Sequence, residues 1–368
     1  MRRWVIKVGS SSLSSGEGGL DLGKLSRIVD QLAAVRLLGI EVVLVSSGAV
    51  AAGFQRLGLS KRPQNTAEKQ AAASVGQGLL IEEYAHRFLL HGIQVAQILL
   101  TRSDFSARPR FINAQNTLSL LLRKGVLPIV NENDTVSVEE LTFGDNDRLS
   151  ALVAGLIHAD RLVILSDIEG LYDADPRRKE KARLIPFVDR ITPEIERLAG
   201  ESGSVVGTGG MRSKLEAVKI AMASGIPVFL GHAQTPDLLS RLARGEEVPG
   251  TCFGSDAAPL SVRKQWLWLH AEPAGRLLVD AGAATALCEK GRSLLASGVV
   301  DVEGEFPGGK PVSICCVADG REFARGITPY DSQTLRQMAG LSSAEIARRL
   351  GRSVPVVHRD QMALSPRC

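Results

Sequence analysis

Residues 207–214 read GTGGMRSK, and this stretch decides how the larger part of the 368-residue chain must fold. Three glycines lead into a helical pattern that carries Lys214, and a second lysine, Lys7, precedes a Gly-Ser turn near the other end of the same region. Turn N–H groups, a helix N-terminus and lysine side chains together favour a polyphosphate ligand. We therefore expect one crevice to bring Lys7 and Lys214 together.

The commonest phosphate-binding motifs are absent. Two near matches to G-x-x-x-x-G-K-[ST] begin at Gly18 and Gly304, but Leu25 and Pro311 replace the hydroxyl residue that would hold Mg²⁺. A G-x-G-x-x-G pattern begins at residue 207, but Arg212 occupies its third glycine position, so a Rossmann dinucleotide site is not indicated. A different α/β architecture must bind the phosphate.

Composition favours a globular, cytoplasmic protein of two domains. Hydrophobic residues make up 44%, charged residues 23%, and the net charge is a mild +4. That charge gives no argument for nucleic-acid binding, no apolar run approaches the ~18 residues of a membrane span, and the N-terminus does not read as a signal peptide. Five cysteines without a C-x-x-C pair indicate neither zinc nor a disulfide framework, and we expect reduced thiols.

Apolar runs alternate with helical patterns from residue 1 to about 254. The expected strands are residues 4–8, 42–45, 95–100, 126–130, 162–165 and 227–230. The expected helices include one between its N-cap Asp21 and its terminator Gly39, one at 66–90 and one at 146–158. This alternation predicts an α/β fold, an αβα sandwich with a mainly parallel central sheet. Its ligand site should lie beyond the carboxyl ends of the strands.

The character of the chain changes after about residue 254, where glycines separate short segments. Strands are expected at 277–279, 299–302 and 312–317, and a short helix near 283–290, which predicts a small β-rich, barrel-like domain. The expected organisation is a catalytic domain at 1–254, a linker at 255–271, the β-rich domain at 272–350, and a loosely attached tail at 351–368.

Polar residues follow several expected strands directly. They are Ser46 and Ser47, the Asn-Glu-Asn-Asp run at 131–134, and Ser166 with Asp167. One such loop would be an ordinary turn; several converging beside two lysines indicate a site. The Gly-Asp-Asn-Asp run at 144–147 favours a helix cap, and a carboxylate there can orient the lysines or hold Mg²⁺ through water.

The crevice suits transfer of a phosphoryl group from ATP to a carboxylate. Such an acceptor is already ionised at neutral pH and needs no general base, and the crevice loops contain no histidine. Repulsion between two anions must then be offset by positive charge, and Lys7 and Lys214 can supply it. A lysine in the first turn of a helix is mildly unfavourable, and a bound anion would remove that penalty.

With these motifs assembled, the chain resembles the glutamate 5-kinases (gamma-glutamyl kinases), a branch of the amino-acid kinase family, over nearly its whole length. The matching segments are VIKVGSS at 5–11, VSSGAVAAG at 45–53, NEND at 131–134, GDND at 144–147, DIEGLYDADPR at 167–177 and GTGGMRSK at 207–214. The C-terminal part resembles a PUA domain in PAG at 273–275, DAGA at 280–283, SLL at 293–295, GEF at 304–306 and ARG at 324–326. Ser10, Ser46 and Ser166 stand where threonine is more usual, which keeps the hydroxyls.

The resemblance implies ATP-dependent phosphorylation of the side-chain carboxylate of L-glutamate, the first step of proline biosynthesis. Its implied catalytic residues are Lys7, Lys214 and Asp147, and its implied glutamate-binding residues are Ser47, Asp134 and Asn146. Its implied nucleotide-binding residues are Lys7, Ser166, Asp167, Thr208, Gly209, Gly210, Met211, Arg212, Ser213 and Lys214. Mg²⁺ would be carried by ATP rather than by a protein site. Proline is expected as a feedback inhibitor, and the chain is expected to form a homo-oligomer, a dimer or tetramer.

Other functions share parts of this pattern. Acetylglutamate kinases, aspartokinases and uridylate kinases would share the N-terminal fold, but the 131–134 loop and the C-terminal domain disfavour them. An RNA-binding or RNA-modifying protein could use a PUA domain, yet RNA surfaces need clustered Lys and Arg beside stacking aromatics. Basic residues here are dispersed and Phe306 and Tyr330 are isolated, so we expect no RNA partner.

Overall fold

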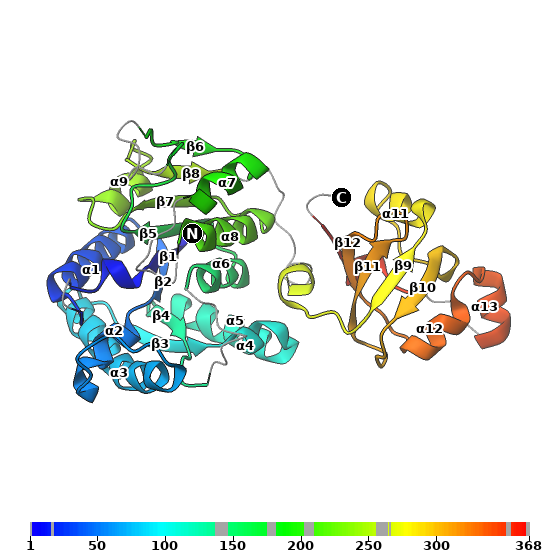
Figure 1. The fold of residues 1–368 in the computed structure, drawn as a ribbon, viewed down its shortest axis with the longest axis horizontal. Helices are drawn as coiled ribbons and strands as arrows, with labels where there is room; N and C mark the ends of the chain where they lie inside the picture. The colour runs from blue at the N-terminus through cyan, green and yellow to red at the C-terminus, as the bar shows by residue number, and fades with distance from the viewer. Residues whose placement is uncertain are drawn as a thin grey trace. The chain divides into compact units, whose positions relative to one another are not determined.

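The computed structural model describes residues 2–15, 18–136, 146–174, 182–201, 210–254, 264, 266–350 and 355–365. The chain forms two compact units (Figure 1). The first comprises residues 1–104 and 109–259, and the second comprises residues 105–108 and 260–368. Each unit has its own hydrophobic core.

The first unit is built on an eight-stranded sheet with the order β3-β4-β2-β1-β5-β7-β8-β6. Its strands are β1 (Arg3–Val8), β2 (Glu41–Ser46), β3 (Val95–Leu100), β4 (Leu127–Glu132), β5 (Arg161–Ser166), β6 (Phe187–Val188), β7 (Val228–His232) and β8 (Thr251–Phe253). The six long strands run parallel, and β8 is antiparallel to β7. This confirms the expected mainly parallel sheet, to which two short strands, β8 and β6, are added at one edge.

Helices cover both faces of this sheet (Figure 1). They are α1 (Leu22–Leu37), α2 (Ala49–Gly53), α3 (Thr66–Leu90), α4 (Arg102–Ser106), α5 (Arg108–Arg123), α6 (Asn146–Leu156), α7 (Pro193–Glu201), α8 (Met211–Ala223) and α9 (Leu238–Arg244). Asp21 caps α1 by accepting a hydrogen bond from Lys24 N at 2.9 Å. Gly39, with φ of +76°, follows its end. α3 has the expected bounds, whereas α6 ends two residues before the expected residue 158, and His158 itself has a left-handed φ of +52°.

Successive side chains of β1 point alternately to the helical layers on the two faces of the sheet. Trp4, Ile6 and Val8 belong to the large core under α1, α3 and α9. Because successive residues of a strand point to opposite faces, Lys7 points to the other side. That side is covered by α6, which packs on β1 and against α8. The αβα sandwich therefore places Lys7 under two helices.

The second unit holds a five-stranded sheet with the order β10-β9-β11-β12-β13. Its strands are β9 (Arg276–Val279), β10 (Val299–Glu303), β11 (Pro311–Cys316), β12 (Glu322–Ile327) and β13 (Met362–Leu364), and its α-helices are α11 (Ala281–Cys288), α12 (Ser332–Met338) and α13 (Ser343–Leu350). The expected β-rich domain is confirmed, and β12 and β13 were not foreseen.

Two segments expected to lie outside this domain pack onto its sheet. β13 pairs with β12, and Val357 forms a bridge with Leu294, so residues 355–365 are not the loosely attached tail that the sequence suggested. In the expected linker, Trp266–His270 forms a π-helical turn (η4). Arg325 of β12 donates hydrogen bonds to the carbonyl oxygens of Trp268 and Ala271 at 3.1 and 2.9 Å. Backbone pairing and arginine contacts of this kind depend on residues that are distant in the sequence, which local composition does not reveal.

The thiols differ in part from expectation. Cys252, Cys315 and Cys316 are free, but Cys288 is disulfide-bonded, which corrects the expectation of reduced thiols throughout. The spacing of cysteines in a sequence does not by itself establish which of them are bonded. Among the described helices, none combines the length and the apolar character that crossing a membrane requires.

Candidate active site

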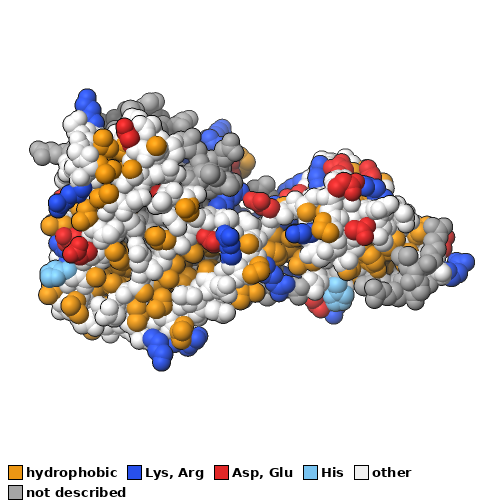
Figure 2. All heavy atoms as spheres, turned by 90° about the horizontal axis from the view of Figure 1, so that it is seen from below, with side chains coloured by type: hydrophobic (Ala, Val, Ile, Leu, Met, Phe, Trp, Pro, Cys, Tyr) orange, Lys and Arg blue, Asp and Glu red, His pale blue; other side chains and the backbone are white. Residues whose placement is uncertain are grey.

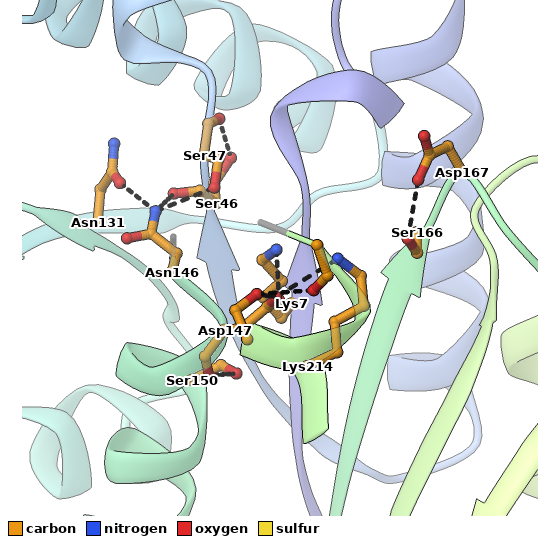
Figure 3. A network of polar contacts seen from close by, with 12 residues as sticks. Lys7, Ser46, Ser47, Asn131, Asn146, Asp147, Ser150, Ser166, Asp167 and Lys214 are labelled. Atoms are coloured by element: carbon orange, nitrogen blue, oxygen red, sulfur yellow. Dashed lines mark hydrogen bonds and ion pairs between the residues drawn. The ribbon is translucent and has the colours of Figure 1, made fainter. Parts of the chain in front are cut away.

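The polar residues gather at the carboxyl ends of the central strands, where the order of the sheet reverses. From β1 the chain proceeds to β2 on one side, and after β4 it crosses through α6 to β5 on the other side of β1. Open α/β sheets bind ligands at such a switch point. Figure 3 shows Lys7 at the centre of this region, with side chains of β2, β4 and α6 to one side and of β5 to the other.

Lys7 and Lys214 meet at one carboxylate (Figure 3). Lys7 Nζ lies 2.5 Å from Asp147 Oδ1, and Lys214 Nζ lies 3.5 Å from Asp147 Oδ2. Ser213 Oγ donates a 2.9 Å hydrogen bond to the same Oδ2. Lys7, Asp147 and Lys214 are 1%, 0% and 6% exposed. The two lysines that the sequence predicted to share a crevice therefore do lie together.

The charge of Asp147 is set by two opposing effects. Burial favours the neutral acid, but Lys7 and then Lys214 outweigh it and hold the pKa of Asp147 at about 2. The carboxylate is thus ionised at neutral pH and pairs with both ammonium groups. Two lysine ammonium groups held close together favour an anionic ligand.

The start of α8 is shaped for phosphate. Gly210 is its N-cap, no side chain caps the helix, and its first turn contains no acidic residue. Backbone N–H groups at such a helix start favour an anion. The side chain of Met211 is buried and that of Arg212 is exposed. Thr208 and Gly209 lie outside the described residues.

Gly9 leaves space beside Lys7. A Cβ at this position would lie 3.5 Å from Lys7 Nζ and 3.9 Å from Leu165 O. The φ of Gly9 is −76°, which any residue can adopt, so the backbone conformation does not require glycine. Both separations are ordinary van der Waals contacts, so a methyl group would fit here, and glycine leaves that small volume beside the ammonium group unfilled.

On one side of Lys7 lies an amide and hydroxyl cluster (Figure 3). Asn146 Nδ2 donates to Ser46 O at 2.7 Å, to Ser47 Oγ at 3.1 Å and to Asn131 Oδ1 at 2.6 Å. Ser47 and Asn146, both expected at the substrate, are thus in contact. Asp134 lies in the turn after β4. Burial, and then the neighbouring Glu132, raise the pKa of Asp134 to about 7.

On the other side of Lys7, β5 ends in Ser166 and Asp167 (Figure 3). Ser166 is buried, and its Oγ donates a 3.0 Å hydrogen bond to Asp167 Oδ1. Asp167 itself is exposed. Two polar subsites therefore flank the central lysine.

Sequence reasoning missed several residues of the amide cluster. Asn131 was visible as the first polar residue after an apolar strand, but nothing marked it above its neighbours. Gln77, which accepts a 2.6 Å hydrogen bond from Asn131 Nδ2, lies within an alanine-rich helix and gave no signal. Tyr84, whose hydroxyl lies 2.9 Å from Ser46 Oγ, reads as an ordinary core aromatic.

Comparison with known proteins agrees with this architecture. Residues 2–232 match the Amino acid kinase family, and residues 275–350 match the PUA domain. A glutamate 5-kinase of Trichlorobacter lovleyi is 50% identical over 366 residues, which cover 99% of this chain and 97% of that protein. A glutamate 5-kinase of Pelobacter propionicus is 48% identical, covering 99% of this chain and 98% of that protein.

A solved structure supports the fold of the first unit. The carbamate kinase from Giardia lamblia bound to AMP-PNP aligns with 69% of this chain and 99% of its own, with a TM-score of 0.51 and 17% sequence identity. At that identity the likeness concerns the fold alone. By family match and by full-length identity, the chain belongs to the amino acid kinase family, in its glutamate 5-kinase branch.

Proposed function

We propose that this protein transfers the γ-phosphoryl group of ATP to the side-chain carboxylate of L-glutamate, which gives L-glutamyl 5-phosphate, the first intermediate of proline biosynthesis. The observation that carries the proposal is the meeting of Lys7 and Lys214 on Asp147, between two polar subsites. The full-length identity to glutamate 5-kinases points to the same reaction.

The chemistry requires positive charge more than it requires a base. An attacking carboxylate and a triphosphate repel each other, and fixed ammonium groups in a dry site offset that repulsion in the transition state. Lys7, at the centre, would lie between the acceptor carboxylate and the phosphates, and Lys214 would contact the phosphates from the start of α8. Asp147 would hold both ammonium groups in place, and its low pKa makes it unsuited to accept a proton.

The two subsites divide the substrates between them. We assign glutamate to the side of Ser47, Asn146 and Asp134, where amide, hydroxyl and carboxylate groups suit an amino acid. We assign the nucleotide to the side of Ser166 and Asp167 and to the helix start. Residues 208–214 would form the turn over its phosphates.

Mg²⁺ would reach the site on ATP. Asp147 already pairs with two ammonium groups, which makes it a poor direct ligand for a cation. The metal would neutralise part of the phosphate charge, and the lysines would neutralise the rest.

Three further expectations follow from the family. We propose that L-proline inhibits the enzyme by competing with glutamate for the subsite of Ser47 and Asn146, that the chain forms a homo-oligomer, and that it works in the cytoplasm. Initial rates at several proline concentrations test the first proposal. Inhibition that glutamate cannot relieve would place proline elsewhere.

The surface of the second unit does not favour the RNA-binding alternative. Three of its arginines pair with carboxylates: Arg276 with Glu303 at 3.1 Å, Arg325 with Glu322 at 2.7 Å, and Arg336 with Glu305 at 2.6 Å. Figure 2 shows basic and acidic side chains interspersed on the visible face of this unit. Tight RNA retention on a filter, weakened steeply by salt, would restore the alternative.

A substrate panel tests the proposed reaction. ATP turnover is measured with free L-glutamate, N-acetylglutamate, aspartate and UMP at equal concentrations. We expect glutamate alone to support rapid turnover, with a product that hydroxylamine traps as a hydroxamate. Preference for any other acceptor would overturn the assignment.

A further inference from the structure

A chain of side-chain amides links helix α3 to the glutamate subsite. Gln77 Oε1 accepts a 2.6 Å hydrogen bond from Asn131 Nδ2, and Asn131 Oδ1 accepts one of 2.6 Å from Asn146 Nδ2. Amide oxygen and nitrogen atoms are nearly the same size, so a chain of amides could in principle run in either direction. Which direction it takes decides which atom faces the ligand.

Two backbone groups show which way the side-chain amides of this hydrogen-bonded series are oriented. Glu132 N–H, which can only donate, contacts Asn131 at 2.9 Å, so the Asn131 atom there must be its oxygen. Ser46 C=O, which can only accept, contacts Asn146 at 2.7 Å, so the Asn146 atom there must be its nitrogen. Asn131 therefore turns its nitrogen to Gln77, and Gln77 must present an oxygen.

Asn146, at the other end of this series of amides, is the residue expected to face the ligand. Asn146 Nδ2 has three acceptors around it. No described residue donates to Asn146 Oδ1, and Figure 3 shows that oxygen pointing away from the network. An amide oxygen accepts hydrogen bonds only. The group that Asn146 binds must therefore be a donor, such as a protonated amine, and not a carboxylate.

Contacts on both sides of Gln77 restrain the position of helix α3. Directly before Gln77, Gly76 crosses Gly53 of α2 so closely that a Cβ on Gly76 would lie 1.8 Å from Ala49 O. Two turns later, Tyr84 of α3 contacts Ser46 of β2 through their hydroxyls at 2.9 Å. Backbone contact on one side and a buried hydrogen bond on the other leave α3 little freedom, so the amide of Gln77 is preorganised.

We propose that Gln77 is a positioning residue that fixes Asn131 and Asn146 so that the subsite accepts substrates with a protonated amine and discriminates against otherwise similar dicarboxylates. Gln77 does not itself touch the substrate. The proposal rests on the proposed function, because it concerns the glutamate subsite.

The test compares binding of L-glutamate with binding of glutarate, which has the same two carboxylates and no amine. Calorimetric titrations use the full chain as Gln77→Met, which keeps the shape and removes the acceptor, and as Gln77→Glu, which keeps an acceptor. The matched control is Gln115→Met. Gln115 is also half-buried, and its amide donates to Leu156 O at 2.8 Å, outside the amide chain.

We expect Gln77→Met to weaken glutamate binding about 10-fold and glutarate binding less than about 2-fold, because Asn131 then loses one of the hydrogen bonds that hold its side chain and orients Asn146 less firmly. The KM for ATP should not change, and Gln77→Glu and Gln115→Met should behave like the parent protein. If Gln77→Met does not fold, Gln77→Ala replaces it.

Two results would overturn the proposal: equal weakening of glutamate and glutarate, or a Gln77→Glu variant as impaired as Gln77→Met. Failure of the parent protein to bind or phosphorylate glutamate is a separate outcome, and it would remove the proposed function itself.

Discussion

Asp147→Asn tests the site directly, because it keeps the shape of the side chain and removes one charge. The carboxylate lies 2.5 Å from Lys7 Nζ and 3.5 Å from Lys214 Nζ, and none of its side chain is exposed. At an effective dielectric constant of about 20, these separations correspond to gross attractions of about 7 and about 5 kcal/mol. Desolvation of three buried ionic groups cancels most of that attraction.

We expect the substitution to lower the free energy of unfolding of the first unit by about 3–5 kcal/mol at pH 7, the range for breaking a buried ion pair. Turnover should fall at least about 100-fold, because neither lysine keeps its position. The pKa of Asp147 is lowered from 3.8 to about 2. The stabilisation is therefore present above about pH 4 and is lost as the pH falls towards 2.

Urea unfolding followed by tryptophan fluorescence measures this difference. Trp4 lies in the first unit, and a background with Trp266→Phe and Trp268→Phe makes it the sole reporter. The matched control is Asp30→Asn, which removes an exposed partner of His91 and should cost less than about 1 kcal/mol. The reasoning is refuted if Asp147→Asn unfolds within about 1 kcal/mol of the parent and keeps most of its turnover.

The other predictions concern single positions. Lys214→Ala should leave the fold intact, as judged by circular dichroism, and reduce turnover at least about 100-fold; near-normal activity would count against its role. The kcat/KM for glutamate should rise with pH through about 7, where Asp134 ionises to receive an ammonium group, and this step should vanish in Asp134→Asn. Because the folded protein favours neutral Asp134, the contribution of this residue to the free energy of unfolding is present below about pH 4 and is lost as the pH rises through about 7. Asp134→Asn should therefore resist urea better than the parent at pH 8. Gly76→Ala should cost more than about 3 kcal/mol in urea unfolding, since its Cβ would lie 1.8 Å from Ala49 O, whereas Gly78→Ala, with nothing within 4 Å, should be neutral or stabilising by about 1 kcal/mol.

The first unit could largely be predicted from its sequence because its signals are local. Asp21 and Gly39 mark the ends of α1, and continuous apolar runs mark the buried parallel strands. β12 was missed because EFARGI contains two charged residues and a glycine. It is a strand because β11 and β13 pair with it, and such pairing depends on tertiary context.

The distinction between local sequence signals and tertiary context also applies to the residues of the site. Lys7 and Lys214 were candidates because a lysine is unusual in an apolar strand and in the first turn of a helix, and Asp147 was one because it belongs to an acidic run. Asn131 and Gln77 are ordinary where they stand, and their roles arise only when α3, β4 and α6 lie together. Residues that bind a ligand were therefore easier to find than residues that orient them.

One feature of β1 sets both the core and the site. Its alternation sends Trp4, Ile6 and Val8 into the core under α1 and sends Lys7 to the layer of α6 and α8. A shift of one residue in register would exchange the faces, burying an ammonium group in the apolar core and exposing that core's side chains to Asp147. The hydrophobic core thus fixes the register of β1, and this register determines that Lys7 points towards the layer of α6 and α8. Where Lys7 points could be inferred from its neighbours, but which helices it meets follows only from the crossover of α6 between β4 and β5.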